Sequence, residues 1–531
     1  SSAFKLIGHS QPRVDTPAKV DGSLVFGIDV RVPGMKVGTV LACPVIGGRL
    51  RSVDEAAAKR VPGVRDVVRL DDAVAVIGDH FWAAKQGLAA LDPQWDEGKH
   101  ARLQTADIIG AQEKASQRDP EVIAKDEGDA PAAIKAAAKT VSAAYQLPFL
   151  SHAPMEPVNA TLHVRPDGAD LWVGTQVPAR ARDTVAKVTG LRPETVQVHN
   201  HLMGGAFGRR LDVDFITQAA AIAKQVPYPV KIVWTREEDI QHDLLRPYYY
   251  DRLSAGLDAQ GRITGWTHHG TGASVMARWQ PKGMQKDGKL DPDTIEGATE
   301  TPYAIPAMRV GFTRVEPPGI TTAWWRGVGA THNVFMVESF MDELAFAAGK
   351  DPIAFRRDMI GDNARARAVL DLVAEKSGWG RKLPKGVGQG VSLQLSFGSF
   401  LAHVLEVEVT PRGEVRLRRA VVAVDCGTVV QPDGVVAQIE GGLIFGLSAA
   451  LYNEITVQDG RVQQSNFNNY RVLRIDEAPR IEVHMIRNDE GPGGIGETGT
   501  VAAAPALVNA IHAATGKRLR RLPIGTQLVG A

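Results

Sequence analysis

The chain has 531 residues, of which 61 are basic and 60 acidic, so its formal net charge is only +1. A balance this close to neutrality excludes bulk electrostatic attraction to nucleic acid or to an anionic membrane. The two cysteines, Cys43 and Cys426, are too few for a disulfide scaffold, a structural zinc site or a four-thiolate iron–sulfur cluster. The most apolar stretch, Val435 to Tyr452, contains Gln438, Glu440 and several glycines, so we expect no membrane-spanning helix.

From Pro17 to Asp96, short β-rich runs alternate with glycine and proline turns, which predicts a compact α/β module. Its expected elements are strands at 37–42, 64–70 and 73–77 and a helix at 53–60. The segment 97–140 is charged and rich in alanine, and its strong helix formers predict an exposed helical linker. Beyond it the pattern predicts, in chain order, a strand at 195–199, a helix ending at Ala223, a helix at 333–348, strands at 401–409 and 481–486, and a helix at 500–514.

A glycine-rich turn precedes the last of these helices. Residues 491–496 formally match the GxGxxG dinucleotide fingerprint, which also needs an acidic residue about 20 positions later. No Asp or Glu follows Glu497, so a nicotinamide site is excluded. The turn instead delivers one carboxylate, Glu497, to the start of a helix. On its own, such an acid is more often a helix-start residue favoured by the helix dipole.

Two further loops are rich in glycine. Residues 204–208, Gly-Gly-Ala-Phe-Gly, form a strand-to-helix turn in which backbone amides can approach an anionic or oxo ligand, although packing alone would also explain it. No GK[ST] follows, which excludes a P-loop. The loop from Trp324 to Gly329 indicates either an anion-binding Arg326 beside aromatic walls or two core tryptophans with a surface arginine.

These loops, in this order, resemble a known family. The matching segments are Gly174 to Gln176, Gly204 to Gly208, Trp325 to Gly329, Val424 to Gly427 with Gln438 to Gly442, and Gly496 to Gly499. Over nearly the whole chain the sequence resembles the molybdenum-binding large subunits of the xanthine dehydrogenase and aldehyde oxidase superfamily, and within it the isoquinoline 1-oxidoreductase beta subunits. The resemblance implies that Glu497 is the catalytic base and that no side chain ligates the metal. It implies cofactor contacts from Gln176, Gly204, Gly205, Ala206, Phe207, Gly208, Trp325, Arg326, Gly327, Gln438, Gly494 and Gly496.

The fold that the resemblance implies is α+β. Residues 1–96 are expected to form an α/β hammerhead domain, 97–140 the charged helical linker, and 141–380 and 381–531 two molybdenum-cofactor-binding subdomains. Relatives carry an ExGQG segment followed by a long region that helps enclose the cofactor. Residues 388–390, Gly-Gln-Gly, imitate it but precede the predicted strands, and the chain then reaches Asp425 through a short ribbon. We therefore expect an incomplete cofactor region, completed by a separate chain or a cleaved upstream fragment.

The activity implied is hydroxylation of an electron-poor carbon in an N-heteroaromatic compound, with water as the oxygen source and Glu497 as general base. Oxidation of aldehydes to carboxylic acids by the same cofactor is the alternative within the superfamily, and a noncatalytic cofactor-binding scaffold is the alternative from another class. Leu211 stands where purine hydroxylases have a glutamate, which disfavours a purine. The aromatic wall expected for a small uncharged substrate consists of Trp324, Trp325, Phe397 and Phe400.

The cofactor implied is molybdenum-molybdopterin cytosine dinucleotide, as in bacterial enzymes. Iron–sulfur clusters are expected only in a partner, because this chain lacks the thiolates for one. The implied partners are a small iron–sulfur subunit, the completing chain or fragment and a cytochrome c, with no nucleic acid. We expect the bacterial periplasm or its membrane surface rather than the cytoplasm. A further alternative is a hydrolase that uses Ser1 as its nucleophile, and Ser1 is the only residue that supports it.

Overall fold

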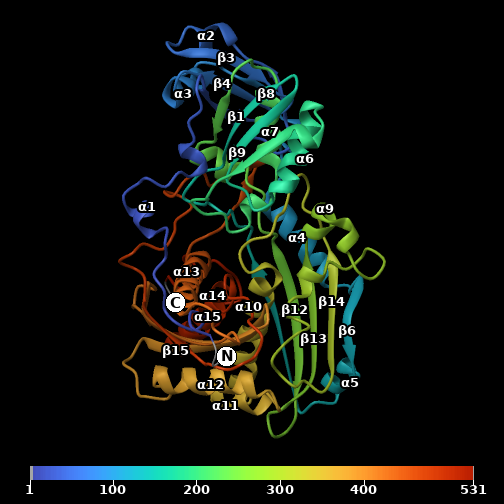
Figure 1. Cartoon of the computed structure of the whole chain (residues 1–531). Coiled ribbons are helices and arrows are strands. Elements are labelled where there is room, and N and C mark those ends of the chain that lie inside the picture. The colour runs from blue at the N-terminus through green and yellow to red at the C-terminus, as the bar shows by residue number, and fades with distance from the viewer. Residues whose placement is uncertain (1–3, 530–531) are drawn as a thin grey trace.

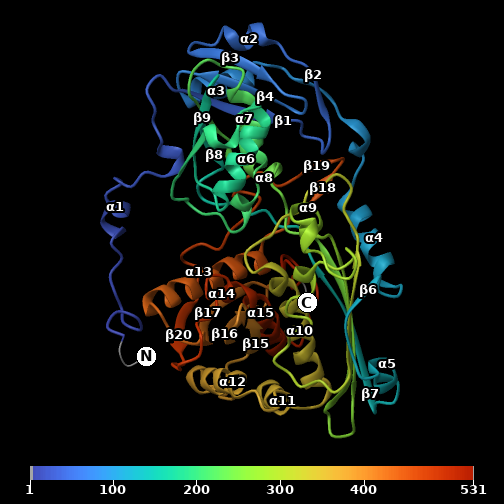
Figure 2. The same ribbon diagram turned by 45° about the vertical axis from the view of Figure 1, so that its right-hand side comes forward.

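The computed structural model describes residues 4–529, so Ser1 lies outside the described residues. Figures 1 and 2 show two lobes, of which the upper contains a mixed seven-stranded sheet in the order β10-β9-β8-β11-β1-β4-β3. Its strands are β1 (Lys36–Ala42), β3 (Val64–Arg69), β4 (Ala73–Gly78), β8 (Asn159–Arg165), β9 (Gly168–Val173), β10 (Val196–Asn200) and β11 (Val230–Val233). The predicted strands at 37–42, 64–70, 73–77 and 195–199 are therefore confirmed.

This sheet combines two distant parts of the chain. β1 pairs in parallel with β11, with Lys36 opposite Val230, so residues 1–96 share their main sheet with residues 159–233. The helices of this lobe are α2 (Glu55–Lys59), α3 (Phe81–Ala89), α6 (Pro178–Thr189), α7 (Asp214–Ala223) and α8 (Arg236–Gln241). A small pair, β2 (Arg49–Ser52) with β5 (Gln94–Asp96), lies beside it, and α1 (Thr16–Val20) precedes it.

The lower lobe contains two more sheets (Figure 2). The first runs β6-β14-β13-β12-β7, and the second β15-β16-β17-β20. Their strands are β6 (Val122–Glu127), β7 (Lys139–Leu147), β12 (Tyr249–Leu257), β13 (Ile263–Gly272), β14 (Met308–Arg314), β15 (Val387–Ser396), β16 (Ser399–Val409), β17 (Val415–Asp425) and β20 (Arg480–Met485). The mixture of helices and strands agrees with the expected fold class.

Helix α10 (Val328–Ala347) lies between these two sheets, in contact with β7, β12 and β15. It is buried along most of its length, and its Phe335 and Phe340 rings contact Tyr145 and Trp266. The other helices of this lobe are α4 (Thr105–Ser116), α5 (Ala130–Lys135), α9 (Val275–Trp279), α11 (Pro352–Met359), α12 (Ala364–Ser377), α13 (Pro432–Leu451), α14 (Thr498–Val501) and α15 (Ala503–Thr515). A short pair, β18 (Val457–Gln458) with β19 (Arg461–Val462), reaches toward the upper lobe.

The segment 97–140, expected as a charged helical linker, contains helices α4 and α5 but also strand structure that was not expected. This segment includes β6, which is an edge strand paired antiparallel with β14, and the start of β7. The apolar run Val122 to Ala124 is short and surrounded by helix formers, and its partner strand lies far along the chain. Because pairing across the sheet overrides local propensity, the segment is part of the lower lobe.

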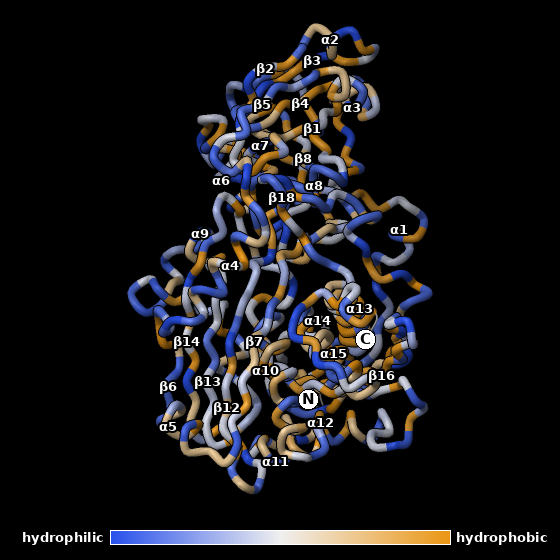
Figure 3. Tube along the Cα trace, turned by 180° about the vertical axis from the view of Figure 1, so that it is seen from behind, coloured by the Kyte–Doolittle hydropathy of each residue, from blue (hydrophilic) through white to orange (hydrophobic). Residues whose placement is uncertain are grey.

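Helix α13 is largely apolar, as its orange colour in Figure 3 shows. Its length and hydropathy would suit a membrane span, but 56% of the apolar window is buried inside the protein. It contacts α14 and α15, so its apolar surface serves the core of the lower lobe. The predicted helix at 500–514 is present as α14 and α15, which meet at Ala502.

Candidate active site

The loop from Trp325 to Gly329 leads into α10 and forms the middle of the site. Gly327 caps the helix with a φ of +98°, and Val328 has a φ of +47°, which is uncommon for a β-branched residue. A Cβ atom on Gly329 would lie 1.5 Å from the carbonyl oxygen of Asp293. Only glycine therefore allows the turn at 292–295 to pack across the start of α10.

Arg326 joins three predicted segments. Its Nε and Nη2 atoms donate to the Gly496 carbonyl oxygen at 3.0 and 2.5 Å, and Nη2 also donates to Gln438 Oε1 at 3.0 Å. Burial lowers the pKa of the guanidinium, and the nearby Glu497 carboxylate opposes that shift. Arg326 thus fixes the Glu497 turn against α13 through hydrogen bonds.

Glu497 is half-buried and forms the N-cap of α14, as its sequence position predicts. Its Oε2 atom accepts a hydrogen bond from the Gly327 amide at 2.9 Å. The carboxylate therefore lies at the N-terminus of α10 as well as at the start of its own helix, and both helix ends favour a negative charge there.

The loop Gly204 to Gly208 contacts the Trp325 loop through backbone atoms and aromatic rings. Gly208 has a φ of +111°, and a Cβ atom on it would lie 1.9 Å from the Trp324 carbonyl oxygen. The Phe207 ring stacks on Phe445 at 4.3 Å between centroids, and Phe445 stacks on Trp325 at 4.5 Å. These contacts hold the two loops together.

A buried ion pair, Glu156 with Arg210, holds the 204–208 loop from behind. Glu156 Oε2 accepts from the Gly204 amide at 2.7 Å and from Arg210 Nη2 at 3.0 Å. Arg210 also donates to the carbonyl oxygens of Gly205 and Gly174 at 3.2 and 3.1 Å. Sequence reasoning missed this pair; the charge of Arg210 directly after the glycine loop is the one local signal for it.

His152 fixes the Trp324 carbonyl from a second buried network. Its Nε2 atom lies 2.8 Å from that oxygen, and its Nδ1 atom lies 3.1 Å from Asp243 Oδ2. Arg209 Nε lies 2.9 Å from the other oxygen of Asp243. Burial alone lowers the pKa of His152, but the Asp243 carboxylate outweighs it and the net shift is upward. A protonated imidazole would donate to both neighbours.

The remaining predicted residues lie at the edges of this assembly. Gln176 is exposed, and its amide donates to the Arg210 carbonyl oxygen at 3.0 Å, beside the 204–208 loop. Ala206 lies within that loop and accepts from the Arg209 amide at 2.9 Å. Gly494 is exposed, and its backbone amide donates to the Phe397 carbonyl oxygen at 2.7 Å. It therefore packs against the turn between β15 and β16.

The four aromatic residues expected to form a substrate wall pack against different partners. Trp324 contacts Trp279, and Trp325 contacts Phe445. Phe400 is buried in the lower core with Arg365 over its ring, whereas Phe397 packs on Gly494. The tryptophans and the phenylalanines therefore have separate packing partners.

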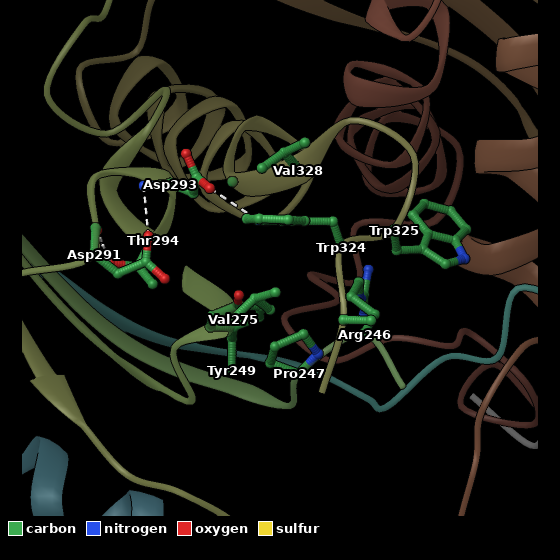
Figure 4. Close-up of a pocket in the computed structure, with 12 residues that line it drawn as sticks. Arg246, Pro247, Tyr249, Val275, Asp291, Asp293, Thr294, Trp324, Trp325 and Val328 are labelled. Atoms are coloured by element: carbon green, nitrogen blue, oxygen red, sulfur yellow. Dashed lines mark hydrogen bonds between the residues drawn. The ribbon is translucent and has the colours of Figure 1, made fainter. Parts of the chain in front are cut away.

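A small cavity of about 20 Å³ is lined by Trp324 and Trp325. Figure 4 shows Asp293 on one side of the Trp324 indole, which donates to its carboxylate at 2.8 Å, and Trp325 with Arg246 on the other. Burial raises the pKa of Asp293 to about 6 and that of the neighbouring Glu296 to about 7. Within residues 4–529, no group of three or more His, Cys, Asp or Glu side chains is arranged to hold a metal ion.

Two family profiles and several known proteins are similar to this chain. Family profiles described as molybdopterin cofactor-binding domains match residues 115–360 and 343–479. The chain is 33% identical to the beta chain of isoquinoline 1-oxidoreductase from Brevundimonas diminuta, over 98% of this chain and 68% of that protein. It is 31% identical to a membrane-bound aldehyde dehydrogenase of Gluconacetobacter polyoxogenes, over 99% of this chain and 72% of that protein.

A third relative is a nicotinate dehydrogenase subunit of Pseudomonas putida, 29% identical over 99% of this chain and 47% of that protein. Among solved structures, quinoline 2-oxidoreductase from Pseudomonas putida 86 shares the fold with a TM-score of 0.82 at 14% identity, covering 98% of this chain and 97% of the other. Aldehyde oxidoreductase from Desulfovibrio gigas gives 0.82 at 15%, covering 99% and 81%. The chain therefore belongs to the xanthine dehydrogenase and aldehyde oxidase family, as a molybdenum-binding large subunit of a molybdopterin-dependent oxidoreductase.

Proposed function

We propose that this chain is the catalytic subunit of a hydroxylase that oxidises an electron-poor carbon of an N-heteroaromatic compound, with water as the oxygen source. The observation that carries the proposal is the position of Glu497, where three glycine segments meet and the Gly327 amide orients its carboxylate. Two relatives, named isoquinoline 1-oxidoreductase and nicotinate dehydrogenase, support an N-heterocycle as the substrate class.

The residues around Glu497 fit a molybdopterin cofactor. A Cβ atom on Gly441 or Gly496 would meet open space, so the backbone is free to face a ligand at both positions. Gln176, Gln438 and Arg326 supply neutral and cationic donors suited to a pterin and its phosphates. These residues, the 204–208 loop, Trp325, Gly327 and Gly494 would hold the cofactor.

In this proposal the chain binds, orients and moves a proton. The cofactor, when bound, supplies the two-electron redox chemistry. Glu497 Oε2 is held by one amide, which leaves the carboxylate able to accept a proton from the attacking oxygen as general base. The Phe207–Phe445–Trp325 stack keeps the supporting loops rigid and excludes water from behind the site.

The test is Glu497→Gln in the purified native complex. The variant should retain molybdenum at the wild-type ratio and lose N-heterocycle turnover by about 100-fold or more, because a general base typically contributes a factor of about 10² to 10⁴. Glu490→Gln, an exposed carboxylate just before the same glycine turn, is the matched control. Near-normal turnover of the Glu497 variant would remove this residue from the mechanism.

Aldehyde oxidation by the same site is the second candidate, favoured by the relative named membrane-bound aldehyde dehydrogenase. Dye-coupled assays with N-heterocycles and aldehydes, compared by kcat/KM, separate the two. A noncatalytic scaffold would show no turnover with either class, although it would bind the cofactor. The retained Glu497 argues against that function, since a scaffold needs no base.

We also propose molybdopterin cytosine dinucleotide as the cofactor form, a small iron–sulfur subunit as the electron acceptor and a cytochrome c beyond it. The names of the relatives as subunits support a multi-subunit assembly. The membrane-bound relative supports a periplasmic or membrane-surface location. Fractionation of cells followed by mass spectrometry of the complex tests both.

A separate chain or an upstream fragment is proposed to complete the cofactor site. In support, β16 leads directly through β17 to Asp425, without the long region that relatives are expected to carry there. Size and sequence analysis of the native complex tests this. Finding this chain alone with a full complement of cofactor would overturn it.

A further inference from the structure

Arg246 is a buried guanidinium without an acidic partner. It follows α8, is 5% exposed, and lies 5.6 Å over the Trp325 ring. Its Nη2 atom donates to the Pro148 carbonyl oxygen at 2.7 Å, but among residues 4–529 it forms no salt bridge with a carboxylate. A buried charge is costly unless an opposite charge or hydrogen bonds compensate it, so Arg246 calls for a counter-ion.

Three residues that line one cavity, Arg246 among them, each carry a buried polar atom without a partner. Within the described residues, the Nε atom of Arg246, the Nε1 atom of Trp325 and the Oγ1 atom of Thr500 form no hydrogen bond. All three residues line a small cavity of about 10 Å³ between the Trp325 loop and helices α13 and α14, which leaves room for a single water-sized particle. Figure 4 shows Arg246 and Trp325 side by side. Aliphatic residues complete most of the lining: Leu147, Pro148, Leu150, Ala449, Ala450, Ala504 and Leu522.

The chemistry of these groups favours an anion over water. Arg246 Nε and Trp325 Nε1 can only donate, and the Thr500 hydroxyl can donate as well. An anion accepts all three hydrogen bonds and neutralises the guanidinium. A water molecule that accepted the two N–H bonds would still have to place two hydrogens of its own among mainly aliphatic neighbours. Burial lowers the pKa of Arg246 to about 10, so the group stays charged near neutral pH.

The number of donors also limits the size of the anion. A sulfate or phosphate carries four oxygens, and those that the three donors do not reach would be buried against alkyl groups at a large cost. A monatomic anion has no such requirement. We propose that this cavity is a binding site for chloride, held by Arg246, the Trp325 indole N–H and the Thr500 hydroxyl.

The chloride site would support the catalytic loops from behind. Thr500 lies in α14, and its amide donates to the Glu497 carbonyl oxygen at 2.9 Å. Trp325 directly precedes Arg326, which holds the Gly496 carbonyl. The anion therefore links the first turn after Glu497 to the loop that orients its carboxylate. The site has no role in electron transfer, so it does not depend on the proposed substrate class.

Bromide replaces chloride in such sites and has a strong anomalous X-ray signal, which gives a direct test. Crystals of the native complex grown in sodium bromide should show an anomalous peak within hydrogen-bond distance of Arg246 Nε, Trp325 Nε1 and Thr500 Oγ1. An empty cavity, or density there without an anomalous signal, would overturn the proposal.

A solution experiment tests the same site independently. At constant ionic strength, the thermal midpoint of the wild-type complex should rise by about 1 °C for each tenfold increase in chloride above the dissociation constant. Thr500→Val keeps the shape of the side chain, removes one donor and should weaken this response. Thr161→Val, at a buried threonine in β8 whose hydroxyl also lacks a partner, is the matched control and should keep it. Equal chloride responses in all three proteins would refute the assignment.

Discussion

Replacing Glu156 with glutamine tests how the 204–208 loop is held. The wild-type carboxylate accepts four hydrogen bonds. Oε1 accepts from the Ile28 amide at 3.0 Å and Asn159 Nδ2 at 2.9 Å, and Oε2 accepts from the Gly204 amide at 2.7 Å and Arg210 Nη2 at 3.0 Å. Glutamine has the same shape but carries one oxygen and one NH₂ group. In either orientation of the amide, the NH₂ group therefore faces two N–H donors, and those two hydrogen bonds cannot form.

The expected cost follows from these contacts. Two hydrogen bonds to a charged acceptor are lost, at about 1.5 to 3 kcal/mol each. The Arg210 guanidinium is also left buried without its counter-charge, and breaking a buried pair costs about 3 to 5 kcal/mol in total. We therefore expect Glu156→Gln to lower the free energy of local opening around Gly204 by about 3 to 5 kcal/mol, and to lower molybdenum content.

Hydrogen exchange measures this opening directly. Peptides covering residues 200–212 should exchange about 100-fold faster or more in the variant, because about 1.4 kcal/mol corresponds to a factor of ten. Glu97→Gln removes the same charge from an exposed pair with Arg461 and should change stability by less than about 1 kcal/mol. Unchanged protection in the 200–212 peptides of the Glu156 variant would show that the ion pair does not hold this loop.

Two further predictions concern the packing of the loops and the acids beside α10. Gly208→Ala should bind much less molybdenum per chain than Gly190→Ala. Both positions have a positive φ, but a Cβ atom at position 208 would lie 1.9 Å from a backbone carbonyl oxygen, whereas one at position 190 would meet open space. Equal metal content in the two variants, measured by mass spectrometry, would contradict this prediction. Glu296→Gln should change the pH dependence of stability. Burial, Asp293 and Glu497 raise the pKa of Glu296 to about 7 from 4.5, so the folded state keeps a proton that the unfolded chain releases. This contribution to stability is full below pH 4.5 and is lost as the pH rises through about 7. Thermal midpoints between about pH 5 and pH 8 should therefore fall less with rising pH in the variant than in the wild type, and parallel profiles would exclude the effect.

The elements that local patterns specify were predictable. Strands with apolar runs between glycine and proline turns, such as 73–77, are present where expected, and so is the helix start at Glu497. Strand β6 was missed because its partner β14 lies far along the chain. The sheet of the upper lobe likewise joins β1 to β11, which no local pattern in residues 1–96 indicates.

In the candidate site, too, some features could be predicted from local sequence and others could not. Its glycine loops carry a local signal, because tight turns and close approach require glycine at defined positions. The groups that support them carry none: Glu156 lies in an irregular segment, and Phe445 is one apolar residue among many on α13. Their contacts with Gly204, Phe207 and Trp325 exist only in the folded chain.

Backbone atoms make the closest contacts between the three glycine segments. The Trp324 carbonyl lies against Gly208, the Gly496 carbonyl accepts from Arg326, and the Gly327 amide donates to Glu497. A side chain at position 208 would have to occupy the place of a carbonyl oxygen, so the loops would separate and the position of the Glu497 carboxylate would change with them. The position of the proposed base therefore depends on steric fit between loops far apart in sequence, more than on any single side chain beside it.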